Sequence, residues 1–150
     1  MDLGELTLKA FLDAISQAKP APGAGAAGDV ALALAAACAA KAFAISARHV
    51  QDAGLDQAAE QARSIAGLAL AGAQWDAEDF TALLKTHDAA AGGALRRDGE
   101  AMLALAAQLR TLIRAHEDHT TAAMAGDLIA AEALIAAFET IERRDLQELG

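Results

Sequence analysis

The chain has 150 residues, a length that suits a single domain built around one hydrophobic core. Alanine supplies nearly three residues in ten, aromatic residues only 3%, and no strand-like alternation occurs, which predicts an all-α protein with closely packed helices. The net charge of −9 argues against a nucleic-acid partner, because such partners require clustered Lys and Arg side chains.

Five helical segments are predicted, joined by short connections that favour an antiparallel helical bundle of about five helices in one domain over residues 1–150. The break between the third and fourth segments is expected at Ala90-Ala91-Gly92-Gly93, with Asp98 as the N-cap that follows it. The predicted segments cover about residues 6–17, 26–51, 56–87, 98–115 and 121–146.

The first segment ends at an elbow, Pro20-Ala21-Pro22-Gly23-Ala24-Gly25, which contains the only two prolines of the chain. Proline fixes φ and glycine permits positive φ, so such an elbow can hold backbone N–H groups at a helix N-terminus. Unpaired amides at that position favour an anionic or carbonyl oxygen of a ligand. A simple turn between two helices explains the same residues and stays open as the alternative.

The second segment is almost uncharged up to Ser46, with Asp29 and Lys41 as its only charges. The apolar run between these two charges has eleven residues, fewer than a membrane span needs, and the acidic N-terminus lacks the basic start of a signal peptide. We therefore expect a soluble, cytoplasmic protein without a membrane partner. The single cysteine, Cys38, cannot form an internal disulfide and is expected to be inert.

Three short motifs occur in the order found in one family of folate enzymes. Phe11-Leu12-Asp13-Ala14 followed by the elbow resembles the opening of the formimidoyltetrahydrofolate cyclodeaminase and methenyltetrahydrofolate cyclohydrolase family. Asp76-Ala77-Glu78-Asp79-Phe80 resembles the D-x-x-A-F motif of that family, and Gly126-Asp127-Leu128-Ile129-Ala130-Ala131 resembles its S-D-x-x-x-A motif. The chain departs from the family where Gly-Gly-Gly-Ser has become Gly23-Ala24-Gly25-Ala26 and where a Pro-Lys pair near Ala90 is missing.

The resemblance implies a helical homodimer that takes a reduced folate or similar pterin as substrate, with no metal and no redox cofactor. It implies that Pro22, Gly23 and Gly25 face the polar end of the ligand. Asp76 and Asp127 would then be catalytic bases or pterin anchors. The ligand is expected in a cleft between the elbow and the start of the fifth helix.

Helical projection places two charges among apolar neighbours. Lys41 shares a stripe of the second segment with Leu34, Cys38 and Ile45, so it must snorkel, pair with a carboxylate such as Asp127, or face a wet pocket. In the last case Lys41 would stabilise charge or donate a proton. Asp127 begins a stripe of the fifth segment that continues through Ala131, Leu134, Phe138 and Ile141 and is expected to face the core; a local surface ion pair is the alternative.

Two other polar clusters carry weaker signals. Asp76 and Asp79 are less than one helical turn apart, a spacing that suits either acid–base work or a solvated surface. His116-Glu117-Asp118-His119 is the one metal-like cluster, but no further ligand stands at a diagnostic spacing, so a polar turn is the favoured interpretation.

Two classes of function follow. In the first, the protein is a cyclodeaminase (a lyase) that closes a 5-formimino group onto N10 with loss of ammonia, or a cyclohydrolase (a hydrolase) that adds water to a methenyl bridge. Both reactions need positioned acid–base groups. In the second, the protein is a non-catalytic, dimeric helical binding or assembly protein that keeps the family scaffold. The altered glycine motif, the missing Pro-Lys pair and the compact length favour this alternative.

Overall fold

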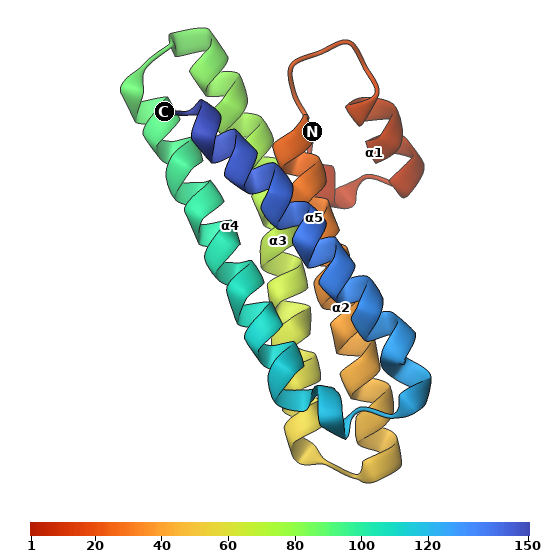
Figure 1. Ribbon diagram of the computed structural model, residues 1–150. Helices are drawn as coiled ribbons and strands as arrows, with labels where there is room; N and C mark the ends of the chain where they lie inside the picture. Colours follow the sequence, from red (N-terminus) through yellow and green to blue (C-terminus); the bar gives the residue numbers. More distant parts are fainter.

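The computed structural model describes residues 1–150 and contains five α-helices and no strand, which confirms the predicted all-α bundle. Helices α2 to α5 form an elongated antiparallel bundle, and the short α1 lies beside the start of α2 (Figure 1). The helices are α1 (Leu8–Ile15), α2 (Ala24–Val50), α3 (Ala53–Thr86), α4 (Ala89–His116) and α5 (Ala125–Glu148). Short 3-10 turns cover Leu3–Glu5, Glu117–His119 and Ala122–Met124.

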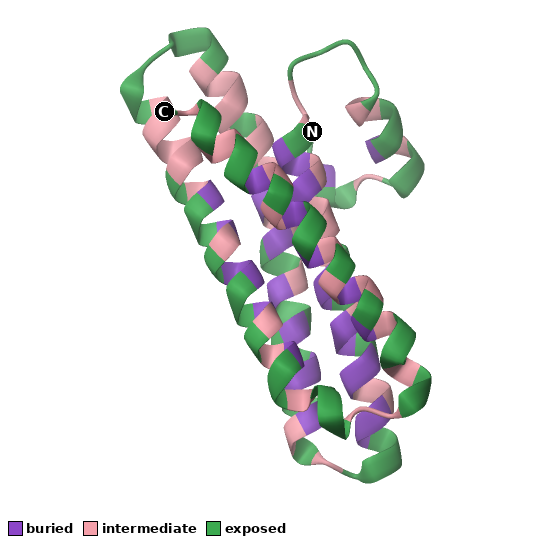
Figure 2. Ribbon diagram, viewed as in Figure 1, coloured by how far each residue is buried: buried purple, intermediate pink, exposed green.

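The core is built largely from alanine. Helix α2 packs against both α3 and α5, and buried residues, most of them alanine, occur along most of its length (Figure 2). Small side chains let the helix backbones approach closely, and a few large residues then fill the remaining space. The largest of these fully buried side chains are Phe43, Phe138, Leu32, Leu55, Leu109, Ile113 and Ile135.

Helix α1 is attached by one side only. Phe11 is buried against Ala26 of α2 and Ala73 of α3, with Leu3 completing this small cluster. Leu8 and Leu12 of the same helix are 70% and 57% exposed.

The start of α4 differs from the prediction. The helix begins at Ala89 and runs through Gly92 and Gly93, and Asp98 lies inside it rather than at its N-cap. The carboxylate of Asp88 is the actual cap: its Oδ1 accepts hydrogen bonds from the amides of Ala90 and Ala91 at 2.5 and 3.1 Å. A cap of this kind stabilises a helix by about 1 kcal/mol, which offsets most of the cost of one internal glycine.

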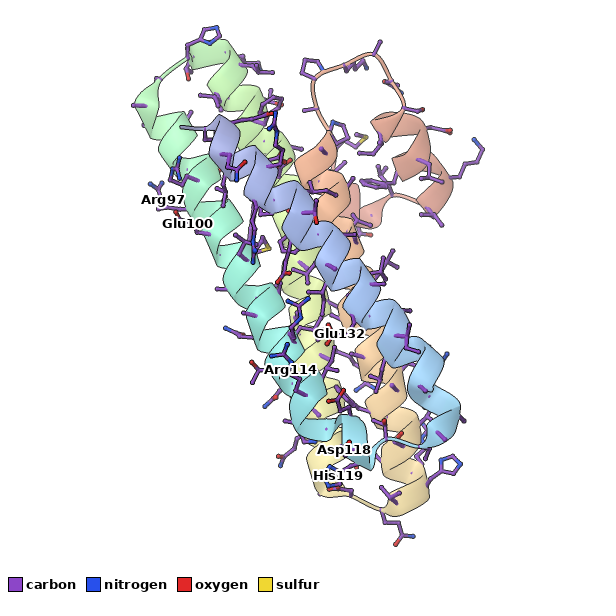
Figure 3. The ribbon with its side chains drawn as sticks, viewed as in Figure 1. Arg97, Glu100, Arg114, Asp118, His119 and Glu132 are labelled. Carbon is purple, nitrogen blue, oxygen red and sulfur yellow. The ribbon has the colours of Figure 1, made fainter.

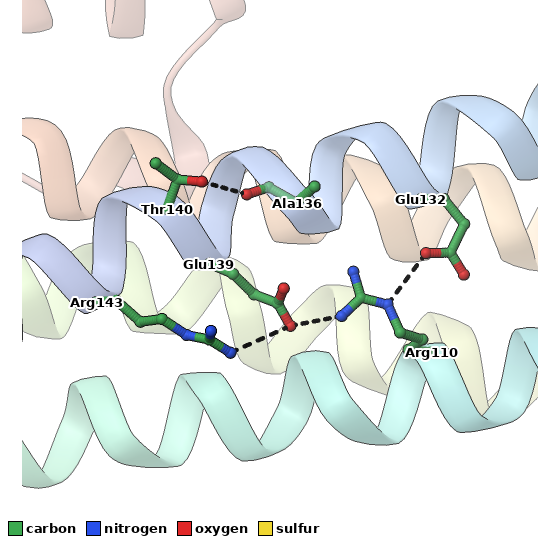
Figure 4. A network of polar contacts seen from close by, with 6 residues as sticks. All are labelled: Arg110, Glu132, Ala136, Glu139, Thr140 and Arg143. Carbon is green, nitrogen blue, oxygen red and sulfur yellow. Dashed lines mark hydrogen bonds and ion pairs between the residues drawn. The ribbon is translucent and has the colours of Figure 1, made fainter.

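A polar clamp joins α4 to α5 at the middle of the bundle (Figure 4). The guanidinium of Arg110 donates to Glu132 at 3.1 Å and to Glu139 at 2.7 Å, and Arg143 lies 4.0 Å from the same Glu139 oxygen. Arg110 and Glu139 are mostly buried, with side chains 22% and 18% exposed. The clamp therefore fixes the register of the two helices beside an otherwise apolar core.

By length and composition, α2 is the one helix that could cross a membrane. Half of its most apolar stretch is buried inside the bundle. Core helices of soluble proteins share this composition, so this finding is weak support for a membrane span.

Candidate functional site

A cavity of about 440 Å³ opens at the end of the bundle where α2 and α4 begin and where α3 and α5 end. Four of the side chains that line it are carboxylic acids, and no Lys, Arg or His lines it. Its full lining is Pro20, Gly23, Ala24, Gly25, Asp76, Phe80, Leu83, Leu95, Glu142, Asp145, Glu148 and Leu149. The pocket is thus lined by the predicted elbow, by carboxylic acids and by apolar side chains.

Two carboxyl groups of this pocket hold protons near neutral pH. Burial, with the nearby charges of Asp76 and Asp145, raises the pKa of Glu142 to about 7. Burial and the charge of Asp145 raise the pKa of Asp76 to about 6, although a hydrogen bond from the Ala26 amide opposes the rise. The pKa of Asp145 is raised by burial and by the charge of Glu148. Groups with pKa values close to the working pH are the most effective general acids and bases.

A third buried acid, Asp29, lies one helical turn further into the bundle than Gly25, on the same face of α2. Its side chain is 3% exposed, and its Oδ1 atom has no hydrogen-bond partner. Burial raises the pKa of Asp29 to about 8, and the charges of Glu142 and then Asp76 act in the same direction. Asp29 is therefore protonated at neutral pH, and its protonation is coupled to the charges of the acids that line the pocket.

Asp29, Glu142 and the half-buried Asp76 each pack against a glycine on a neighbouring helix. A Cβ atom on Gly25 would lie 2.6 Å from Cγ of Asp76, one on Gly72 would lie 3.1 Å from Oδ2 of Asp29, and one on Gly99 would lie 3.1 Å from Cδ of Glu142. The elbow glycines are not needed for positive φ, which only Gly150 among the glycines adopts. Their role is to leave room for carboxyl groups between closely packed helices.

Asp76 also faces the start of α2. Gly23 is the N-cap residue of α2 and supplies no side-chain cap, so the first amides of this helix depend on other partners. The hydrogen bond from Ala26 to Asp76 provides one from a different helix. The positive end of the α2 dipole therefore points toward the pocket.

The structure brings together some of the residues that the sequence singled out and separates others. Gly23, Gly25 and Asp76 line the same cavity. Pro22 belongs to the elbow but is not part of the lining. Asp79 lies outside the cavity and faces Asp98, and its pKa is raised by burial and by that neighbour.

Lys41 and Asp127 form an ion pair of their own, with 2.7 Å between Nζ and Oδ1. The Lys41 side chain is 57% exposed, and the hydrogen bond to Asp127 raises its pKa. Lys41 is sixteen residues beyond Gly25 on α2, which corresponds to about 24 Å along the helix. The expected cleft between the elbow and the start of the fifth helix is therefore wrong for a single chain: the elbow meets the end of α5 instead.

The expectation that Asp127 faces the core is wrong, whereas the pairing of Lys41 with Asp127, one of the alternatives left open by the sequence, is present at the surface. Leu34 is 52% exposed and Cys38 and Ile45 are half-buried, so the stripe that carries Lys41 is the outward side of α2. On α5 the buried stripe is Leu128, Ala131, Ile135, Phe138 and Glu142. The carboxylate on the core face of α5 is thus Glu142 rather than Asp127.

Sequence reasoning missed the functional candidates Asp29 and Glu142. A signal existed for Asp29, since it is the only acidic residue in the long apolar stretch of α2. Glu142 continues the 3-4 spacing of Ile135 and Phe138, which places it on the core face.

The remaining candidate sites lie elsewhere. An open groove of about 760 Å³ runs between α3 and α4, but it is lined by apolar and neutral side chains and offers no acid–base group. The histidine turn lies at the opposite end of the bundle from the acidic pocket; Figure 3 shows Asp118 and His119 there, far from Arg97 of α4. No group of three or more His, Cys, Asp or Glu side chains is arranged to hold a metal ion.

The chain is thus an all-α bundle whose candidate site, an acidic pocket, lies between helix ends. No protein-family model and no curated protein matches the chain. Among solved structures, the crystal structure of formiminotetrahydrofolate cyclodeaminase from Thermotoga maritima has a TM-score of 0.88, covering 97% of this chain and 78% of that one at 20% sequence identity. The resemblance seen in the motifs is therefore confirmed at the level of the fold, and the chain has the fold of that cyclodeaminase.

Proposed function

We propose that this protein binds a reduced folate carrying a one-carbon unit on N5 or bridging N5 and N10, and that it moves protons at that unit. The observation that carries the proposal is the acidic pocket, where Asp76 and Glu142 have pKa values of about 6 and 7 and neither forms an ion pair. The shared fold and the order of the motifs support the choice of substrate class.

The charge of the pocket suits both sides of the cyclodeaminase reaction. A protonated 5-formimino group and the methenyl product each carry a delocalised positive charge over an N–C–N unit. Carboxylates stabilise such charges strongly when water is excluded. The pocket has no cationic side chain, so the anionic glutamyl end of the folate would extend outward to solvent.

Asp76 and Glu142 can divide the proton transfers between them. N10 adds to the carbon of the 5-formimino group, and one ionised carboxylate removes the N10 proton. The other carboxyl, still protonated, donates to the exocyclic nitrogen, which leaves as ammonia and generates the methenyl cation. In the cyclohydrolase direction the same pair would remove a proton from water and protonate a ring nitrogen.

Two measurements test this function. Calorimetry should show binding of 5-formyltetrahydrofolate, and turnover of 5-formiminotetrahydrofolate should release ammonia. Because a general acid or base contributes about 10²- to 10⁴-fold, Glu142→Gln should lower kcat/KM by at least a hundredfold. Glu100→Gln makes the same chemical change on the exposed face of α4 and should leave kcat/KM unchanged. If no reduced folate binds, the non-catalytic binding or assembly function replaces this proposal.

We also propose that the chain pairs with a second copy through the outward stripe of α2. Leu34 is 52% exposed there, beside the half-buried Cys38 and Ile45, and a core rich in alanine buries little area per residue. Light scattering should give a mass near twice 15.3 kDa. Leu34→Asp should halve that mass, whereas Leu8→Asp, on the equally exposed α1, should not. A parent protein that is monomeric at micromolar concentration would contradict the pairing.

A further inference from the structure

We propose that the acidic pocket is a general organic-cation site, which binds an amidinium or protonated amine attached to a flat apolar group even when no pteridine is present. This inference rests on the same pocket as the proposed folate function and names the chemical feature of the ligand that the pocket recognises. Four observations lead to it.

The first is that four of the acidic groups have no ion-pair partner within the protein. None of the ion pairs in the molecule includes Asp29, Asp76, Glu142 or Asp145. Glu148, at the rim, is the only lining acid that is paired, with Arg144 at 2.8 Å. A buried carboxylate without a partner is strongly unfavourable, so a ligand that brings positive charge gains more here than at the surface.

The second is the orphan atom of Asp29. Its Oδ1 is buried and has no partner, although more than nine-tenths of buried polar groups in proteins have one. Glu142 and Asp76, which line the cavity, are the charges that act on Asp29 most strongly. Asp29 does not line the cavity, but its charge state is coupled to the two acids that do.

The third is the spacing of the glycines. Gly25, Gly72 and Gly99 lie on three different helices. A Cβ atom on Gly25 or Gly99 would collide with a carboxyl group, and one on Gly72 would meet the Met102 sulfur at 2.7 Å and Asp29 Oδ2 at 3.1 Å. The backbone therefore approaches the acids closely and leaves no space for a neutralising side chain from the protein itself. When these acids ionise, a bound cation can supply the positive charge that the protein does not place beside them.

The fourth is the apolar wall. Phe80, Leu83 and Leu95 line the cavity together with the acids, so a ligand with a flat hydrocarbon part can bury it while its cationic end meets Asp76 and Glu142. A planar amidinium carries parallel N–H donors that match a carboxylate in a bidentate pair. A bare metal ion fits less well, because no three ligating side chains are arranged to coordinate one.

Benzamidine is the probe that separates charge from shape, because benzamide is nearly the same size and neutral. Benzamidine should bind and raise the melting temperature, and benzamide at the same concentration should do neither. Glu142→Gln should weaken benzamidine binding by about tenfold or more. Asp145→Asn, at a half-exposed position that is less prone to disturb folding, should also weaken it, whereas Glu100→Gln should not.

Proton release gives an independent readout. The titratable and charged groups of the site and its surroundings are Asp29 on α2, Asp76 and Asp79 on α3, Arg97 and Asp98 on α4, and Glu142, Arg144, Asp145 and Glu148 on α5. A cation requires ionised partners, so binding at pH 6.5 should release protons, and the apparent binding enthalpy should change with the ionisation enthalpy of the buffer. The affinity should rise by about a hundredfold between pH 5.5 and 8, as Asp76 and Glu142 lose their protons.

The outcomes distinguish this inference from the folate function. Equal binding of benzamidine and benzamide, or binding of neither, would overturn the cation site even if folates bind. Benzamidine binding with proton release in a protein that ignores every reduced folate would keep the cation site and remove the folate function.

Discussion

Replacing Asp29 by Asn is expected to stabilise the protein at alkaline pH. The pKa of Asp29 is about 8 in the folded protein and about 3.8 in the unfolded chain, so the folded state keeps a proton that the unfolded state has already lost. The stability that Asp29 contributes to the parent protein is therefore fully present below about pH 4 and is lost as the pH rises toward 8. Asparagine has no proton to lose and removes this dependence.

The expected size of the effect follows from the linkage between protonation and folding. One carboxyl within its titration window changes the free energy of unfolding by about 1.4 kcal/mol per pH unit. The advantage of Asp29→Asn over the parent should therefore grow by about 2–4 kcal/mol between pH 5 and pH 8 in denaturant melts. Glu100→Gln, an amide substitution at an exposed site, should follow the parent at every pH. Parallel curves for Asp29→Asn and the parent would mean that Asp29 is ionised throughout.

A second large effect is expected from adding one methyl group at Gly25. Its Cβ would lie within 2.6 Å of Cγ of Asp76, a side chain too short to move away easily. Gly25→Ala should therefore lower the free energy of unfolding by about 1–3 kcal/mol and weaken ligand binding in the pocket. Combining it with Asp76→Ala should recover part of the lost stability, because the second change frees the space that the methyl group needs.

Gly67 provides the matched control for this substitution. It lies in α3, and no atom stands within 4 Å of the position where its Cβ would be. Gly67→Ala should stabilise the protein by up to about 1 kcal/mol, because alanine favours helix more than glycine does. Opposite signs for the two variants in urea melts would separate the close approach at Gly25 from the general preference of helices. The same sign would show that Asp76 relaxes without cost.

The sequence predicted the helices far better than their orientation. Caps, glycines and prolines mark helix ends locally, which is why five helices were placed within a few residues of their positions in the structure. The one larger error, at the start of α4, arose because Asp88 caps a helix that tolerates Gly92 and Gly93. Cap chemistry outweighed the expected break at those glycines.

The inward face of α2 could not be read from its sequence. Nearly every side chain of that helix is apolar, so no periodicity distinguishes the side that meets α3 and α5 from the side that meets solvent. Lys41 has apolar neighbours on the helix whichever side of α2 is taken to be buried. Only the packed bundle shows that Lys41 faces outward. The same ambiguity hid Asp29, whose burial depends on contacts with distant helices.

Only half of the candidate site could be predicted from the sequence, because the other half depends on how distant helices pack. The elbow and Asp76 carry motifs, and both reach the pocket. Glu142 and Asp145 carry none, because their part in the site comes from where α5 ends relative to α2 and α3. A motif identifies residues that act through local geometry, whereas a pocket between helix ends is also made of residues that only the tertiary fold brings together.

The reciprocal packing of α2 and α3 offers a way to recognise distant relatives. Gly25 precedes Asp29 by four residues, and Gly72 precedes Asp76 by four residues, so each helix carries a glycine for the acid of the other. Because the two helices are antiparallel, neither acid can be buried unless both spacings are present. A search for paired Gly-x-x-x-Asp segments on adjacent alanine-rich helices should therefore find chains with this pocket even where the glycine elbow and every other motif have diverged.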